Sequence, residues 1–153
     1  MNFLAEIYTD GSCHTQLCIG AWASIILVDG EQITLTGKQN DTTHNRMEIV
    51  AVINAIKYVL QNHKHINELK IVSDSQYVIG LVDRQMKFIT SDYKTKAGND
   101  IRNIDLVKEL LHLLSVIKVS FQKIKAHQKP GSVINYNIEV DKLSRKLVRE
   151  AVG

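Results

Sequence analysis

Acidic residues follow two apolar stretches of this 153-residue chain, IYTDGSC and KIVSDSQ, in which a hydroxyl residue precedes the aspartate. These aspartates are Asp10 and Asp74, and the motif TTHNRMEI and the last predicted helix add Glu48 and Asp141. Four carboxylates in a partly dry site would repel one another, and divalent cations would relieve that repulsion. All-oxygen ligation favours Mg²⁺ or Mn²⁺, and two such ions about 3.5–4 Å apart can support phosphodiester cleavage. The chemistry that this set predicts is that of a metal-dependent nuclease.

Each carboxylate also has an ordinary structural explanation when it is taken alone. Asp74 would cap a helix that begins at Ser75, because aspartate is a preferred N-cap residue. Glu48 and Asp141 would be exposed residues on the surfaces of their helices. Spacing along the sequence does not establish that the carboxylates converge, so both interpretations stay open at this point.

The predicted elements nevertheless place the carboxylates favourably. Strands are predicted at 3–9, 20–28, 31–37, 69–73 and 116–124, with a hairpin turn at 29–30, and helices at 43–62, 75–83, 99–115 and 136–152. This order predicts an α/β fold with a mixed five-stranded sheet flanked by helices, in a single domain over residues 1–153. If the strands before Asp10 and Asp74 are parallel neighbours, both side chains lie at one edge, where ligands bind such sheets. Glu48, near the start of the connecting helix, would approach the same edge.

Charge is spread unevenly along the chain. The net charge is +3, but residues 1–117 carry a balance of −2 and residues 118–153 a balance of +5. A basic C-terminal part suits a polyanion such as nucleic acid, although a solvated helix face would have the same composition. No apolar run is long enough to span a membrane, and the N-terminus lacks a signal peptide. Cys13 and Cys18 are expected to be free thiols in a reducing cytosol, so we expect a cytoplasmic protein.

The combined motifs resemble those of type 1 ribonuclease H over nearly the whole chain. They occur in the family's order as YTDGSC (8–13), TTHNRMEI (42–49), SDSQYV (73–78), RNIDL (102–106) and KAHQ with NYNIEVDKLSR (125–145). The resemblance implies a ribonuclease H-like fold and an endonuclease that hydrolyses the RNA strand of RNA–DNA hybrids. It also implies two-metal-ion catalysis that leaves 5′-phosphate and 3′-hydroxyl ends.

The same resemblance implies a role for each motif residue. Asp10 would bridge two Mg²⁺ ions, with Mn²⁺ as a substitute, while Glu48 and Asp74 hold one ion and Asp141 the other. His127, in the loop before the last helix, would assist proton movement or product release. Residues expected to bind the substrate are Gly11, Ser12, Cys13, Asn45 and Gln76 on the side of the 2′-hydroxyls, Thr43 and Asn103 at a phosphate pocket for the DNA strand, and Asn137 in the last helix motif. We expect a free-standing monomer.

Some positions depart from the family's pattern. His44 stands where an asparagine is common, and Asp41 where a pocket arginine is often found, so weaker contacts to the hybrid are expected. The connector 83–105 corresponds to a hybrid-gripping handle of some members, with Phe88 and Tyr93 as candidate stacking groups. A weak handle and a plain solvated connector are both open. The alternative functions are a catalytically weak or silent hybrid-binding module and another nuclease of the same fold.

Overall fold

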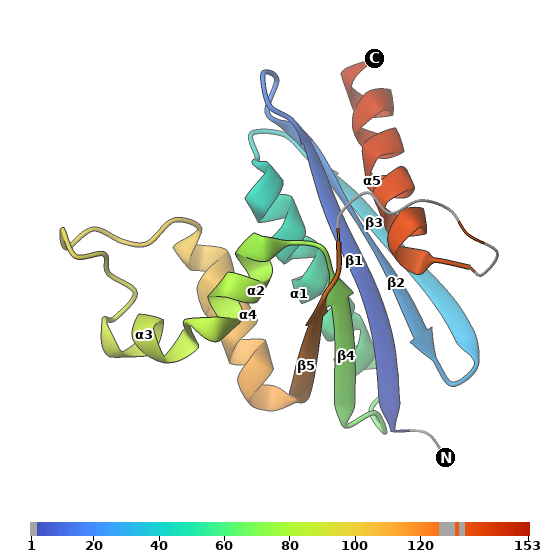
Figure 1. The fold of residues 1–153 in the computed structure, drawn as a ribbon, viewed down its shortest axis with the longest axis horizontal. Coiled ribbons are helices and arrows are strands. Elements are labelled where there is room, and N and C mark those ends of the chain that lie inside the picture. The colour runs from blue at the N-terminus through green and yellow to red at the C-terminus, as the bar shows by residue number, and fades with distance from the viewer. Residues whose placement is uncertain (1–2, 126–130, 132–133) are drawn as a thin grey trace.

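The computed structural model describes residues 3–125, 131 and 134–153. Its centre is a five-stranded sheet in the order β3-β2-β1-β4-β5, with helices on both faces (Figure 1). The elements are β1 (Leu4–His14), β2 (Ile19–Val28), β3 (Glu31–Gln39), α1 (His44–Asn62), β4 (Glu68–Ser73), α2 (Gln76–Asp83), α3 (Gln85–Thr90), α4 (Ile104–Val116), β5 (Lys118–Lys123) and α5 (Tyr136–Val152). The first three strands are antiparallel, whereas β4 and β5 run parallel to β1. The mixed sheet predicted from the sequence is confirmed.

Alternation along the strands divides the apolar residues between two clusters. Ile7 and Ile26 are partners in the β1–β2 register and belong to the larger core, which lies under α1 and α4. Tyr8 and Ile25, the next pair, face the opposite side and pack with Val140 of α5. Because successive side chains of a strand point to opposite faces, one run of apolar residues supports both helical layers.

The predicted boundaries of β1, α2 and α4 need correction. The sequence suggested that β1 ends at Asp10, but it continues to His14 because the antiparallel pairing with β2 persists. The suggestion that Asp74 caps α2 is wrong, since Ser75 is the N-cap and its hydroxyl accepts the Val78 N–H. Helix α4 begins at Ile104 rather than near residue 99, because Asn103 adopts a left-handed conformation with φ of 57°.

The connector 83–105 contains a short helix, α3, that the sequence analysis missed. Phe88 of α3 is only 6% exposed, and its ring stacks on that of Tyr93 with centroids 6.5 Å apart. The two rings proposed to stack on bases are therefore engaged with each other. Whether the connector grips a hybrid stays a prediction.

No helix among the described residues is a candidate for a membrane span. Over the described ranges, none combines the length and the apolar character that a membrane span requires.

Candidate active site

Two aspartates follow the last residue pair of the parallel β1–β4 ladder. That pair is Thr9 and Ser73, so Asp10 and Asp74 come next on adjacent strands. Beyond this pair the two strands separate, because β1 continues along β2 whereas β4 ends and is followed by α2. Ser73 supports this turn, because its hydroxyl accepts the Ser75 N–H at 3.0 Å. The edge expected from parallel pairing is thus present, although Asp10 lies inside a strand rather than at its end.

Helix α1 brings a third carboxylate to the same place. A Cβ on Gly11 would lie 2.5 Å from the backbone nitrogen of Glu48, and one on Gly20 would lie 2.7 Å from the Met47 side chain. These contacts are too short for any other residue, so two glycines on β1 and β2 allow α1 to lie directly on the sheet. One oxygen each from Asp10, Glu48 and Asp74 consequently lies within 4.8 Å of the others.

The carboxylates of Asp10 and Glu48 are buried and electrostatically strained. The residues are 5% and 1% exposed, respectively. Desolvation, followed by the neighbouring carboxylates, raises the pKa of both groups well above their ordinary values. The Gly11 N–H donates to Asp10 Oδ1 at 2.9 Å, but Glu48 Oε2 is buried and has no hydrogen-bond partner in the part of the chain that the structure describes. With both carboxylates ionised, this arrangement is costly unless a cation neutralises it.

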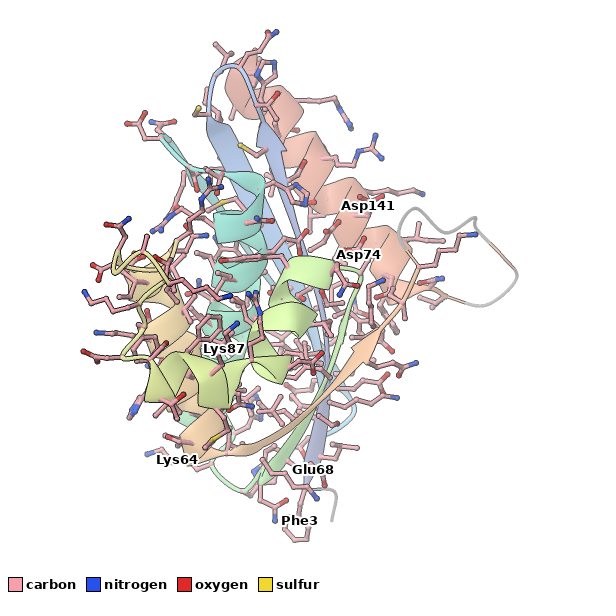
Figure 2. All side chains as sticks on the ribbon, turned by 60° about the vertical axis from the view of Figure 1, so that its left-hand side comes forward. Phe3, Lys64, Glu68, Asp74, Lys87 and Asp141 are labelled. Atoms are coloured by element: carbon pink, nitrogen blue, oxygen red, sulfur yellow. The ribbon has the colours of Figure 1, made fainter. Side chains whose placement is uncertain are left out.

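Asp141 of α5 faces these three carboxylates across a cleft. Its charge contributes to the raised pKa of Glu48, and Figure 2 shows it near Asp74 at the end of β4. The guanidinium of Arg145, one helical turn later, lies 3.6 Å from the Asp141 carboxylate. The buried side chain of Val140 anchors this part of α5 on the sheet. Convergence of all four predicted carboxylates on one cleft is therefore a property of the fold.

The cleft has a volume of about 420 Å³. Besides the four carboxylates, four predicted substrate-binding residues line it: Gly11, Ser12, Asn45 and Gln76. His44 also lines the cleft. So do three residues to which the sequence analysis gave no role, namely Ser75, Tyr77 and Arg145. Arg145 had a detectable signal, because residues four apart share a helix face and Arg145 follows Asp141 at that spacing. Tyr77 had none.

Among the described residues, the other predicted substrate-binding residues do not line this cleft. Cys13 donates weakly to the Thr42 carbonyl at 3.6 Å, and Thr43 caps α1 by accepting the Arg46 N–H. The side-chain oxygen Oδ1 of Asn137 is buried without a hydrogen-bond partner among the described residues. His127 lies outside the described residues.

A hydrogen-bond network around Arg46 connects the predicted phosphate-pocket residues. Its guanidinium donates to Asn103 Oδ1 at 3.3 Å and to both carboxylate oxygens of Asp105 at 3.0 and 2.8 Å. Asn103 in turn donates to the hydroxyl of Tyr77, which lines the cleft. Since Thr43 accepts the Arg46 backbone N–H, one arginine links the starts of α1 and α4 to the cleft wall.

The two departures from the family's pattern have different surroundings. Asp41 is exposed in a left-handed turn with φ of 50°. His44 is an exposed residue, and its Nε2 lies 3.1 Å from Glu48 Oε1.

Comparison with known proteins identifies the family. The RNase H family model matches residues 4–149. Proteins named Ribonuclease H from Wolbachia pipientis wMel and Caldicellulosiruptor saccharolyticus are 36% and 32% identical to this chain over 146 residues, covering 95% and 94% of it and 95% of each relative. The Ribonuclease H of Chlorobaculum parvum is 30% identical over 98% of the chain and 99% of its own length. The chain therefore belongs to the ribonuclease H family of enzymes.

Proposed function

We propose that this protein is an endonuclease that hydrolyses the RNA strand of RNA–DNA hybrids, using two divalent cations, in one catalytic domain that spans the chain. The preferred ion would be Mg²⁺, with Mn²⁺ as a substitute, and the products would carry 5′-phosphate and 3′-hydroxyl ends. We further propose that it works as a monomer in the cytoplasm.

The observation that carries this proposal is the meeting of Asp10, Glu48 and Asp74 at one sheet edge. Three carboxylate oxygens within 4.8 Å of one another offer the donor set of a hard divalent ion. Burial and mutual repulsion disfavour ionisation of Asp10 and Glu48. Glu48 Oε2, which has no hydrogen-bond partner among the described residues, needs a positive partner once it is charged. These residues fit a cation site, with Asp141 positioned to contribute from α5.

The chain's own residues would divide the work. Asp10, Glu48, Asp74 and Asp141 would hold the cations, which when bound would neutralise the carboxylates and stabilise charge on the scissile phosphate. The Gly11 N–H keeps the Asp10 carboxylate in place.

Recognition of the substrate would come from residues around the carboxylates. Asn45 and Gln76 line the cleft and offer amide groups to the 2′-hydroxyls that distinguish RNA from DNA. Thr43 and Asn103, held by Arg46, would contact a phosphate of the DNA strand. His127 would assist proton movement or product release. Such contacts read sugars and phosphates, so little dependence on base sequence is expected.

The decisive experiment compares end-labelled substrates in Mg²⁺ and in Mn²⁺. An RNA–DNA hybrid, single-stranded RNA, duplex RNA and duplex DNA would be incubated with the wild type and with Asp10→Asn. Cleavage confined to the RNA strand of the hybrid, and abolished by chelator and by the substitution, supports the proposal. Binding of the hybrid without cleavage in either ion would instead identify a hybrid-binding module. Light scattering during gel filtration measures the mass of the particle and tests the monomer.

A further inference from the structure

His44 reaches from the mouth of the cleft to a buried carboxylate. It is the first residue of α1, one turn before Glu48, and the two side chains face each other because residues four apart share a helix face. The distance from His44 Nε2 to Glu48 Oε1 is 3.1 Å. The His44 side chain is 59% exposed and that of Glu48 only 2%, so the imidazole bridges solvent and the interior.

The two oxygens of Glu48 have different surroundings. Oε1 faces the imidazole, whereas Oε2 is buried and lacks a hydrogen-bond partner within the described ranges. A carboxylate that holds a cation is ionised and can only accept hydrogen bonds. In that state a hydrogen bond across the 3.1 Å contact would have His44 Nε2 as its donor.

We infer that His44 is a positioning residue, which donates a hydrogen bond to Glu48 Oε1 and thereby directs Oε2 to the cation. This inference rests on the proposed function, because it assumes that the carboxylates hold a metal ion. A glutamate side chain has several rotatable bonds, and an unsupported one would lose more freedom when it binds an ion. Loss of an outer partner of a metal-binding carboxylate weakens metal affinity about 10–100-fold in general.

Residues around His44 do not duplicate this function. The Gly11 backbone, which also faces the Glu48 carboxylate, belongs to the sheet and already donates to Asp10 Oδ1. Asn45 lines the cleft beside His44 but lies one position along the helix, so its side chain projects in a different direction from that of residue 44. Among the described residues, the imidazole is therefore the side-chain donor within reach of Oε1.

The test measures metal affinity without substrate. Mn²⁺ binding to the full chain would be followed by the loss of the free-ion EPR signal, and Mg²⁺ binding by calorimetry. The variants are His44→Ala, which removes the donor, and His44→Gln, whose amide N–H can occupy nearly the same position. His112→Ala is the matched control, because His112 is an exposed histidine in the middle of α4. Circular dichroism checks that each variant is folded.

We expect His44→Ala to bind both ions about tenfold more weakly, His44→Gln to come within about threefold of the wild type, and His112→Ala to match it. Wild-type affinity in His44→Ala, or equal losses in the alanine and glutamine variants, would overturn the inference. A directly coordinated imidazole nitrogen in pulsed EPR of the Mn²⁺ complex would also overturn it, since His44 would then be a ligand.

Asp10→Asn separates this inference from the proposed function. If it abolishes ion binding while His44→Ala does not weaken it, the metal site stands and only the role of His44 is wrong. If the wild type binds neither ion, or Asp10→Asn binds as well as the wild type, the metal site itself is wrong and the inference falls with it.

Discussion

The backbones of Gly11 on β1 and Glu48 on α1 are in direct contact. The approach is so close that a Cβ on residue 11 would lie 2.5 Å from the Glu48 nitrogen and 2.6 Å from the Met47 carbonyl carbon. Both neighbours are backbone atoms and cannot rotate away. The absence of a side chain at residue 11 thus sets the distance between the sheet and α1. That distance brings Glu48 to Asp10.

Gly11→Ala is therefore expected to push α1 away from the sheet. We predict a loss of about 1–3 kcal/mol in the free energy of unfolding, together with weaker metal binding. Urea denaturation and Mg²⁺ calorimetry would measure the two effects. Gly80→Ala is the matched control, because Gly80 is in α2 and its nearest contact would be an arginine side chain at 3.8 Å. That control should be neutral or gain up to about 1 kcal/mol, and equal losses in both variants would contradict the prediction.

Asp10→Asn is expected to separate stability from activity. Asparagine removes a buried charge from the carboxylate cluster, so the metal-free protein should become more stable by about 1–3 kcal/mol. Loss of a ligand that holds the ions should lower the cleavage rate by at least about 10²–10³-fold. Thermal unfolding in chelator and a single-turnover cleavage assay would measure these opposite changes. A less stable variant in the absence of metal would argue against strain among the carboxylates.

The pH dependence of stability follows from the same cluster. Burial and neighbouring charges raise the folded-state pKa of Asp10 and Glu48 above their ordinary values of 3.8 and 4.5. Between those ordinary values and the raised ones, the folded state binds more protons than the unfolded state, so stability falls as pH rises. Without metal, we predict a decrease of about 1–3 kcal/mol between about pH 5.5 and about pH 8.

Saturating Mg²⁺ should abolish most of this decrease, because the cation stabilises the ionised carboxylates. Urea midpoints at both pH values, with Mg²⁺ and with chelator, test the prediction. A separate loss of stability is expected below about pH 4. The Arg46 contact lowers the folded-state pKa of Asp105, and its contribution to stability disappears when the Asp105 carboxylate is protonated. Stability that rises between about pH 5.5 and about pH 8 in chelator would contradict the assignment.

Ser75→Ala should weaken the start of α2. The Ser75 hydroxyl accepts the Val78 N–H at 3.2 Å, and loss of such a cap costs about 1 kcal/mol. Because Asp74 immediately precedes this cap, metal affinity should fall along with stability. Ser120→Ala is the control, since Ser120 is exposed on β5 and should change stability by less than about 0.5 kcal/mol. Metal affinity unchanged in Ser75→Ala would show that the cap does not hold Asp74.

Arg46→Lys should weaken substrate binding more than turnover. A lysine cannot reproduce the planar fork that contacts both Asp105 oxygens and Asn103, so the predicted phosphate pocket loses its support. We predict a KM for hybrid about 3–10-fold higher with kcat nearly unchanged, as expected when uniform binding is lost. Lys57→Ala is the control, because Lys57 also links α1 to α4, through Glu109, but in an exposed ion pair. A fall in kcat alone would assign Arg46 a different function.

Local sequence signals were sufficient to predict the strands and most helices and to single out the four carboxylates. Alternation and the hairpin signal identified β1 to β3, and the order of elements indicated a mixed sheet. The motifs identified Asp10, Glu48, Asp74 and Asp141 before any geometry was known. Where the prediction failed, a non-local pairing or an unusual backbone conformation decided the result: β1 continues because β2 pairs with it, and Asn103 delays α4 by a left-handed turn.

Only the tertiary structure shows where each carboxylate lies and how far it is buried. By itself, Glu48 was expected to be exposed, yet it is 1% exposed because Gly11 and Gly20 allow α1 to lie on the sheet. The contact of His44 with Glu48 and the Arg46 network likewise depend on side chains that meet only after packing. The sequence determined which chemical groups are available. Their burial and separation, which set the pKa values, depend on distances between segments far apart along the chain.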